Sequence, residues 1–136
     1  MVSDRLKLAF FFLACAQAAH SLEEYLGRLW EVFIPARFLT NLISETNPVL
    51  GFLVINVSLV AFGFFCYFYV VRPATPTALP WIWFWVLLET VNGVGHTVWA
   101  IISRTYQPGL LTAPAFLILV PIMVFELRRA RVSLDS

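Results

Sequence analysis

Long apolar runs separated by short polar or proline-containing stretches dominate this chain. The pattern predicts four helices, over residues of about 5–26, 48–71, 79–103 and 110–130. Pro48 and Pro80 open the second and third of these runs, where proline suits the first helical turn. The sequence therefore predicts an all-α fold in which residues 1–136 form a single domain.

The apolar runs are long enough to cross a membrane. Residues 46–71 and 105–125 contain no charged side chain, and a hydrocarbon core of ~30 Å takes about 20 helical residues to cross. The chain is 60% hydrophobic and 12% charged, whereas a soluble domain carries about 25% charged residues. These features predict a polytopic membrane four-helix bundle.

The segment 27–46, between the first two predicted helices, has a different composition. Arg28, Glu31 and Arg37 are mixed with apolar residues at helical spacing, and Pro35 interrupts the segment. We expect an amphipathic interfacial segment that lies on the membrane surface or folds back over the bundle. A plain surface helix fits the same pattern.

The basic residues predict the orientation of the bundle. Placing both termini in the cytoplasm leaves six lysines and arginines inside (Arg5, Lys7, Arg72, Arg128, Arg129, Arg131) and three outside (Arg28, Arg37, Arg104). Cytoplasmic loops favour positive charge, so a multi-pass protein of the cytoplasmic membrane with both termini cytoplasmic is predicted. Alternatively, residues 5–18 resemble a cleavable signal peptide ending in Ala16-Gln17-Ala18, which would leave three spanning helices.

Two predicted helices carry ionisable or amide side chains inside their apolar runs. The first helix presents a polar face formed by His20, Glu23 and Glu24. The third presents one formed by Glu89, Asn92 and His96. A carboxylate at the centre of a membrane helix costs roughly 3 kcal/mol, which makes such residues functional candidates. In a hairpin topology these two helices run in the same direction, and at ~1.5 Å per residue the two histidines reach the same depth.

Histidine and carboxylate ligands in this arrangement suit a divalent metal such as Zn, Fe or Mn. His20 and Glu24, four residues apart, can bind one ion, and His96 can add a third ligand. Glu23 is the candidate general base, with Glu89 as the alternative, and Asn92 orients the substrate or a ligand. If Glu23 is the base, Glu89 supports His96. We therefore expect a metal-dependent, hydrolase-like enzyme acting on a membrane lipid or another apolar small molecule.

Three alternatives fit the same residues. Crowded carboxylates can supply an acid and a base without metal, as in a lipid isomerase or cyclase. A small transporter or channel subunit could pass an ion or proton along the polar cluster. The cluster could also be a hydrogen-bond network that only fixes helix packing. The sequence has a net charge of +1 and lacks nucleic-acid motifs, so no nucleic-acid partner is expected.

Three ordered motifs resemble a known family. His20-Ser21-Leu22-Glu23-Glu24 matches an H-x-x-E-E signature, and Asn92-x-x-x-His96 and Tyr106-Gln107-Pro108-Gly109 are similar to further motifs. The chain thus resembles the HXXEE family of small bacterial and archaeal membrane proteins, whose function is unknown. The resemblance implies a bacterial or archaeal membrane protein whose functional set is His20, Glu23, Glu24, Asn92 and His96. It implies no particular reaction.

Overall fold

The computed structural model describes residues 2–132, which are helical apart from short connections and contain no strand. The elements are α1 (Asp4–Leu26), α2 (Leu29–Val32), α3 (Ile34–Ile43), α4 (Pro48–Cys66), the π-helical turn η1 (Tyr67–Val71), α5 (Ala78–Ser103) and α6 (Ala113–Val132). The all-α prediction is confirmed. The predicted segment 27–46 forms α2 and α3.

Local sequence signals account for where the long helices begin. The Ser3 hydroxyl caps α1 by accepting a hydrogen bond from the Leu6 amide at 3.1 Å. Asn47 caps α4 through the Leu50 amide, also at 3.1 Å, and Pro48 occupies the first turn. Helix α6 begins at Ala113, three residues after the predicted start at about residue 110.

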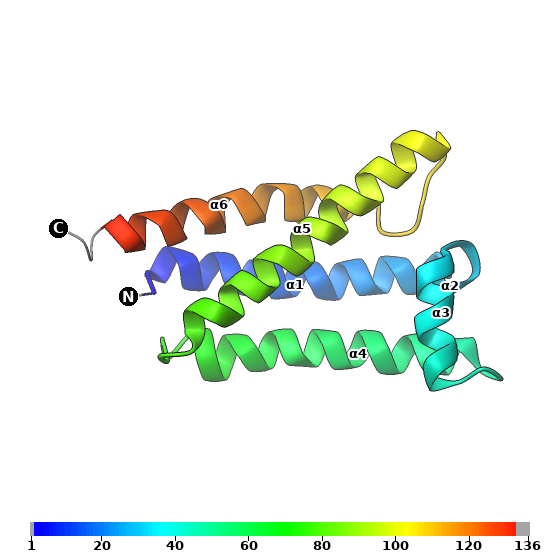
Figure 1. Ribbon diagram of the computed structural model, residues 1–136, viewed down its shortest axis with the longest axis horizontal. Helices are drawn as coiled ribbons and strands as arrows, with labels where there is room; N and C mark the ends of the chain where they lie inside the picture. The colour runs from blue at the N-terminus through cyan, green and yellow to red at the C-terminus, as the bar shows by residue number, and fades with distance from the viewer. Residues whose placement is uncertain (1, 133–136) are drawn as a thin grey trace.

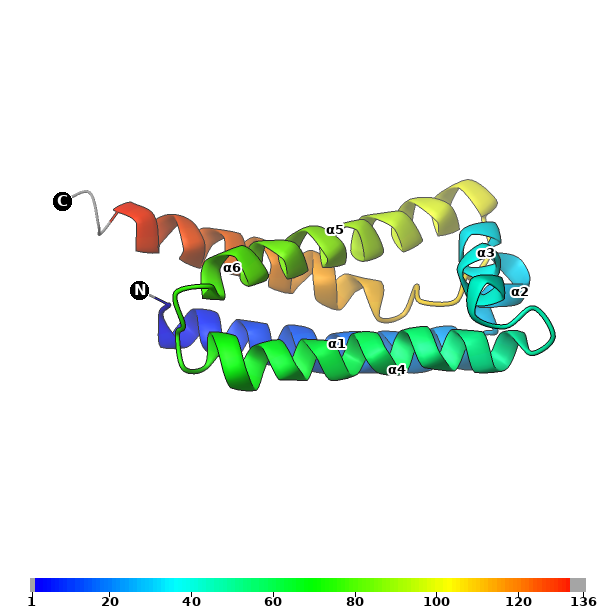
Figure 2. The same cartoon turned by 60° about the horizontal axis from the view of Figure 1, so that its bottom comes forward.

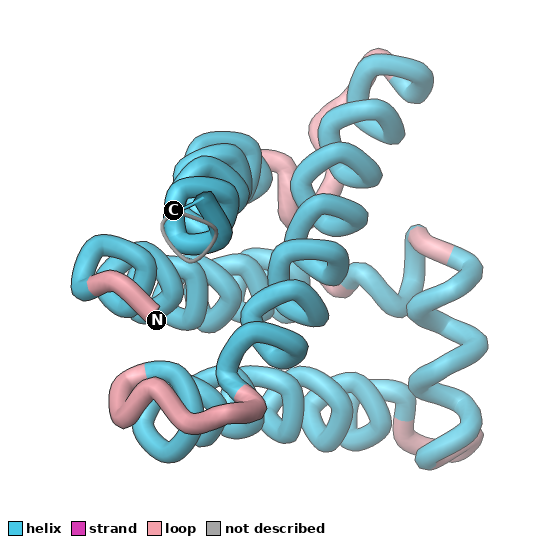
Figure 3. The backbone as a smooth tube through the Cα atoms, turned by 60° about the vertical axis from the view of Figure 1, so that its left-hand side comes forward, coloured by secondary structure: helices cyan, strands magenta, loops and turns pink. Residues whose placement is uncertain are grey.

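The long helices form an open bundle (Figure 1). Helices α1, α4 and α6 run side by side along the molecule, while α5 crosses them obliquely (Figures 1 and 3). As predicted, α1 and α5 run in the same general direction. Short helices α2 and α3 lie across one end of the bundle (Figure 2), opposite the end that holds the N-terminus and the α4–α5 connection.

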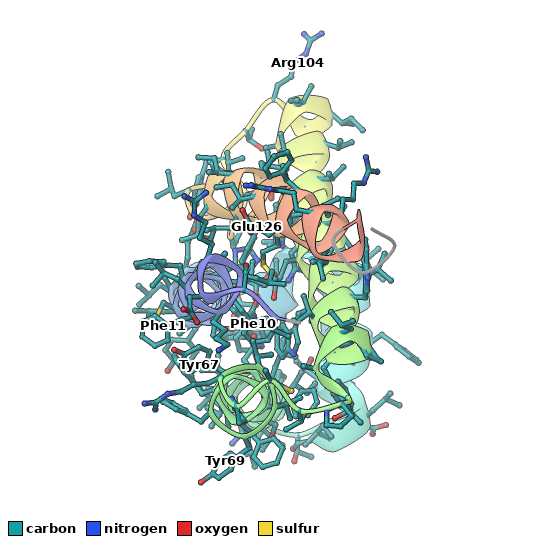
Figure 4. All side chains as sticks on the ribbon, turned by 90° about the vertical axis from the view of Figure 1, so that its left-hand side faces the viewer. Phe10, Phe11, Tyr67, Tyr69, Arg104 and Glu126 are labelled. Atoms are coloured by element: carbon teal, nitrogen blue, oxygen red, sulfur yellow. The ribbon has the colours of Figure 1, made fainter. Side chains whose placement is uncertain are left out.

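The bundle half that holds the N-terminus has an apolar core. Phe10 of α1 meets Trp85 of α5 edge-on, with ring centroids 6.3 Å apart, and both are almost fully buried. Gly63 of α4 lets that helix approach Trp85, because a Cβ there would lie 3.2 Å from the indole. Figure 4 looks along the molecule from this end, with Phe10 on α1 and Glu126 on α6 above it.

The membrane prediction finds limited support in helix composition. Within residues 2–132, the stretch Pro48–Val71 is the one helix long and apolar enough to cross a membrane, with a mean hydropathy of 2.4. One such helix is weak evidence for a multi-pass protein. Helices α1 and α5 carry the predicted site residues within their length, and α6 ends in a basic cluster, which lowers their hydropathy.

Candidate metal centre

Two helices bring three buried side chains into one group: His20 and Glu24 of α1, and His96 of α5. His20 and Glu24 share a face because they lie one helical turn apart. Glu24 Oε1 lies 3.3 Å from His20 Nε2 and 3.2 Å from His96 Nε2. The two imidazole rings meet edge-on, with centroids 4.7 Å apart. The structure therefore brings these three residues together, as the sequence predicted.

The spacing of these atoms matches the demands of a metal ion. Metal bonds to histidine nitrogen and carboxylate oxygen are about 2.0–2.1 Å long in tetrahedral sites, so neighbouring ligand atoms are about 3.3–3.4 Å apart. The two distances to Glu24 Oε1 are close to that value. Ligand atoms of all three residues lie within 4.8 Å of one another. The group can hold an ion after small adjustments.

Glu23, the adjacent carboxylate, lies in a different environment. It points from α1 to the connection between α5 and α6 and accepts four hydrogen bonds. Oε1 accepts from the Tyr106 hydroxyl at 2.7 Å and the Leu111 amide at 2.9 Å. Oε2 accepts from the Thr112 amide at 2.9 Å and the Thr112 hydroxyl at 2.6 Å. Glu23 thus fixes this connection onto α1.

These bonds explain why α6 starts late. The Leu111 and Thr112 amides donate to the Glu23 carboxylate, which caps the chain just before Ala113. The Tyr106 hydroxyl remains a donor, because partial burial and the neighbouring Glu23 carboxylate raise the pKa of Tyr106 to about 12. The geometry therefore favours a positioning role for Glu23 over the predicted role as general base.

Thr112 links Glu23 to the metal-ligating group. Its hydroxyl proton goes to Glu23 Oε2, so the oxygen accepts from His20 Nδ1 at 2.7 Å. This places the ring proton of a neutral His20 on Nδ1 and leaves the lone pair of Nε2 facing Glu24. His20 Nε2 is buried and has no hydrogen-bond partner among the described residues. A lone pair beside a carboxylate is stabilised when a positive charge lies between them, which a proton or a metal ion can supply.

The connection between α5 and α6 also covers the two histidines. Gly109 has a φ of +94°, and a Cβ there would lie 2.6 Å from His96 Nδ1 and 2.7 Å from His20 Cε1. Pro108 packs equally closely on Gly27, at the end of α1. A glycine is required at position 109 because a side chain there would collide with both imidazole rings.

Glu89 forms a second buried polar cluster with amide side chains. Asn92 Nδ2 donates to Glu89 Oε2 at 3.0 Å. With its amide nitrogen turned toward the carboxylate, Gln17 donates to the same oxygen at 3.0 Å and to Oε1 at 2.9 Å. Glu89 is fully buried. Its hydrogen-bond partners are thus Asn92 and Gln17, and Gln17 lies one turn of α1 before His20. The prediction that Glu89 supports His96 stays a prediction.

A cavity of about 190 Å³ leads to the ligand group. Glu24, Asn92 and His96 line one side, and Phe52 and Asn56 of α4 line another. Helix α3 closes the cavity with Ala36, Leu39 and Thr40. The predicted interfacial segment therefore forms part of the wall of the site, and Asn92 is the predicted catalytic residue that faces this space.

Helical periodicity alone does not identify some of the residues that form this site. Thr112 and Gly109 lie in a connection, where periodicity carries no information about neighbours. The Pro108-Gly109 pair signals a turn, but it does not reveal which rings the glycine meets. Phe52 and Thr40 look like ordinary apolar or polar positions of their segments.

The fold and site define an all-helical protein with a buried His-Glu-His group that could hold a metal ion. Residues 11–125 match the family described as "Protein of unknown function with HXXEE motif", and the chain belongs to this family. The motif residues are His20, Glu23 and Glu24. No curated protein and no solved structure matches the chain.

Proposed function

We propose that this protein is a membrane-embedded, metal-dependent enzyme that hydrolyses a lipid or another apolar small molecule. The observation that carries the proposal is the buried group of His20, Glu24 and His96, in which His20 Nε2 faces the Glu24 carboxylate and has no hydrogen-bond partner within the described part of the chain. Hydrolysis consumes one water: its oxygen bonds to the attacked carbon of the substrate, and the leaving group departs with a proton.

The exposed surface supports membrane insertion. Large apolar side chains are exposed along every long helix, including Leu87 and Ile101 of α5 at 65% and 69%. A soluble monomer rarely exposes extended apolar surface of this kind. Helix α3 adds an exposed apolar stripe, formed by Ile34, Phe38 and Leu42 at intervals of four. Such a stripe suits a helix that lies in the membrane interface.

The donor set supports Zn, Fe or Mn. Two imidazoles and one carboxylate, with space left beside them, form the ligand set of catalytic sites of these metals. His20, Glu24 and His96 would hold the metal, which would supply a nucleophile by lowering the pKa of water, to about 7 in the case of zinc. The cavity beside Glu24 and His96 supplies the space that a substrate needs.

Residues around the metal ligands have separate roles in the proposed reaction. Glu23 and Thr112 hold the proton of His20 on Nδ1, so that Nε2 is free to bind. Gly109 and the connection around it exclude water from the far side of the imidazoles. Asn92 faces the cavity and can donate to or accept from the polar group of a substrate, and Glu89 fixes its orientation.

Elemental analysis of the purified protein in detergent tests the proposal. We expect about one equivalent of Zn, Fe or Mn per chain, which is lost in a variant that combines His20→Ala and His96→Ala. Glu89→Gln is the matched control, since Glu89 is a buried carboxylate outside the ligand group, and it should keep the metal. Wild-type protein without metal after exposure to all three ions would contradict the proposal.

Glu89 supports a second candidate, a metal-free lipid isomerase or cyclase. A fully buried carboxyl group that contacts two amides can exchange a proton with an apolar substrate inside the bundle. Activity of this kind would survive chelators and would be lost in Glu89→Gln. The same elemental analysis separates the two candidates, because the second requires no metal in active protein.

A further inference from the structure

An open groove of about 540 Å³ runs along the outside of the bundle between α1 and α4. Its walls are apolar side chains of both helices, among them Leu22, Tyr25, Leu53 and Val60. The volume lies within the range of about 300–1,000 Å³ that is usual for small-molecule sites. This groove lies outside the ligand group and has no part in the proposal above.

The groove and the cavity of the metal centre meet at two residues. Phe52 and Asn56 of α4 line both spaces. Asn56 is held in place there: its Oδ1 lies 2.9 Å from the Ser21 hydroxyl oxygen, and its Nδ2 donates to the Phe52 carbonyl at 3.3 Å. Ser21 and Asn56 place polar groups in the groove, and Asn56 also lines the cavity that contains Glu24 and His96.

The direction of the groove matches that of a lipid in a leaflet. Its Phe52 end lies near α3, because Gly51 packs directly on the Thr40 backbone. From there the groove follows α4 to Ala61, away from the α3 end of the bundle. A polar head at the metal centre would therefore lie near the interfacial helix, and a chain in the groove would extend toward the middle of the membrane.

We infer that the groove holds the single hydrocarbon chain of the substrate, a one-chain amphiphile that enters sideways from the membrane with its polar head in the cavity beside Glu24 and His96. This inference rests on the proposed function. Nine residues of α4, at ~1.5 Å per residue, give the groove a length of about 13 Å. Carbon–carbon bonds of ~1.5 Å advance about 1.25 Å each in an extended chain, so about ten carbons fit.

Photo-crosslinking tests the inference. The first probe is a ten-carbon hydroxamic acid, whose head binds metals, with a diazirine near the end of the chain. The second probe has the same chain and an alcohol head that does not bind metals. We expect both to label groove residues such as Val57 and Ala61 in detergent-solubilised protein, with the labelled peptides identified by mass spectrometry. An excess of unlabelled decanol should compete.

Two matched variants of α4 sharpen the test. Val60→Phe fills the groove and should lower this labelling by about five-fold or more, because added atoms in an occupied space are poorly tolerated. Val54→Phe makes the same change on the same helix at an exposed position outside the groove, and it should leave labelling unchanged. The map obtained with wild-type protein stands as evidence even if Val60→Phe does not fold.

The outcomes separate this inference from the proposed function. Labelling spread evenly over exposed apolar residues outside the groove, such as Leu87 and Ile101, would overturn the inference. Groove labelling that appears only when a dimer is diluted to the monomer would also overturn it, because a second copy would then be the occupant. Metal content is measured on the same samples. Groove labelling by the alcohol probe in protein that binds no metal would support the groove and contradict the metal centre.

Discussion

The two halves of the bundle are built from the same helices, but the contacts between these helices differ in kind. Toward the N-terminus, α1 and α5 meet through Phe10 and Trp85, whose contacts are apolar and close-packed. Toward α3, the same helices meet through His20, Glu24 and His96, three buried ionisable side chains in which Glu24 Oε1 lies 3.2–3.3 Å from both imidazoles. Folding alone explains the first half. The second places costly polar groups together, which indicates binding.

The largest expected effect is that of Glu24→Gln, which should weaken metal binding without unfolding the protein. Glu24→Gln removes the negative charge that both imidazoles face and replaces one carboxylate oxygen by an amide nitrogen. Loss of a residue that only supports a ligand weakens metal binding by about 10–100-fold, so we expect loss of this ligand to lower the affinity by more than about 100-fold. The metal-free protein should remain folded, because the substitution removes a buried charge. Metal titration and thermal unfolding in detergent measure the two quantities. Unchanged affinity would contradict the ligand assignment.

A substitution in the apolar half should give the opposite pattern. Trp85→Ala leaves a large cavity between α1, α4 and α5, and we expect a loss of about 3–5 kcal/mol in the free energy of unfolding. Metal affinity of the molecules that remain folded should change little. Unfolding by denaturant, followed by metal titration of the folded fraction, provides the test. A Trp85→Ala protein as stable as wild type would contradict the distinction between the halves.

Thr112 tests the link between Glu23 and His20. Thr112→Val keeps the shape but cannot accept from His20 Nδ1 or donate to Glu23, so metal affinity should fall by about 10–100-fold. Thr112→Ser restores the hydroxyl and should restore most of the affinity. In the metal-free protein, nitrogen NMR of His20 should show a proton on Nδ1 in wild type and a mixture of tautomers in Thr112→Val. The same tautomer in both would refute the link.

A substitution at Gly109 tests whether the α5–α6 connection packs directly on the two histidine rings. Gly109→Ala places a Cβ against both imidazole rings at a positive φ, and strain of this kind costs about 1–3 kcal/mol. We expect lower stability together with weaker metal binding, because the rings must move. Gly95→Ala is the matched control, since a Cβ there meets nothing within 4 Å. Equal behaviour of the two variants would show that the connection does not press on the rings.

The smallest effect concerns Tyr106. Tyr106→Phe removes one donor to Glu23 and should cost about 0.5–1.5 kcal/mol. Because the pKa of Tyr106 is raised to about 12 in the folded protein, its contribution is present below its ordinary value of 10 and is lost as the pH rises toward 12. Tyrosinate absorbance should therefore show a late transition that Tyr106→Phe lacks. A wild-type titration without that transition would contradict the contact.

Helical periodicity predicted much of this arrangement. It gave α1, α4 and α5 within a few residues, because long apolar runs with capping residues and prolines leave little freedom. It also brought His20, Glu24 and His96 together, since spacing along a helix and depth within a bundle determine which side chains meet. These predictions used only local geometry and the shared direction of two helices.

The remaining features depend on contacts that local rules do not describe. Glu23 has the same charge and nearly the same position as Glu24, yet its neighbours come from a connection nearly ninety residues later in the chain. Helix α6 begins later than predicted for the same reason, because the Leu111 and Thr112 amides just before it bond to Glu23. Family motifs marked Tyr106 to Gly109, but the structure was needed to show that they cover the histidines.

X-ray absorption spectroscopy of the metal-loaded protein tests the central claim most directly. With Zn bound, we predict two imidazole ligands and oxygen ligands from Glu24 and water, at about 2.0–2.1 Å, and no sulfur at about 2.3 Å. The imidazole signal should vanish when His20 and His96 are both replaced by alanine. A spectrum with sulfur ligands, or one that keeps its imidazole signal in that variant, would contradict the account, because the ion would then lie elsewhere.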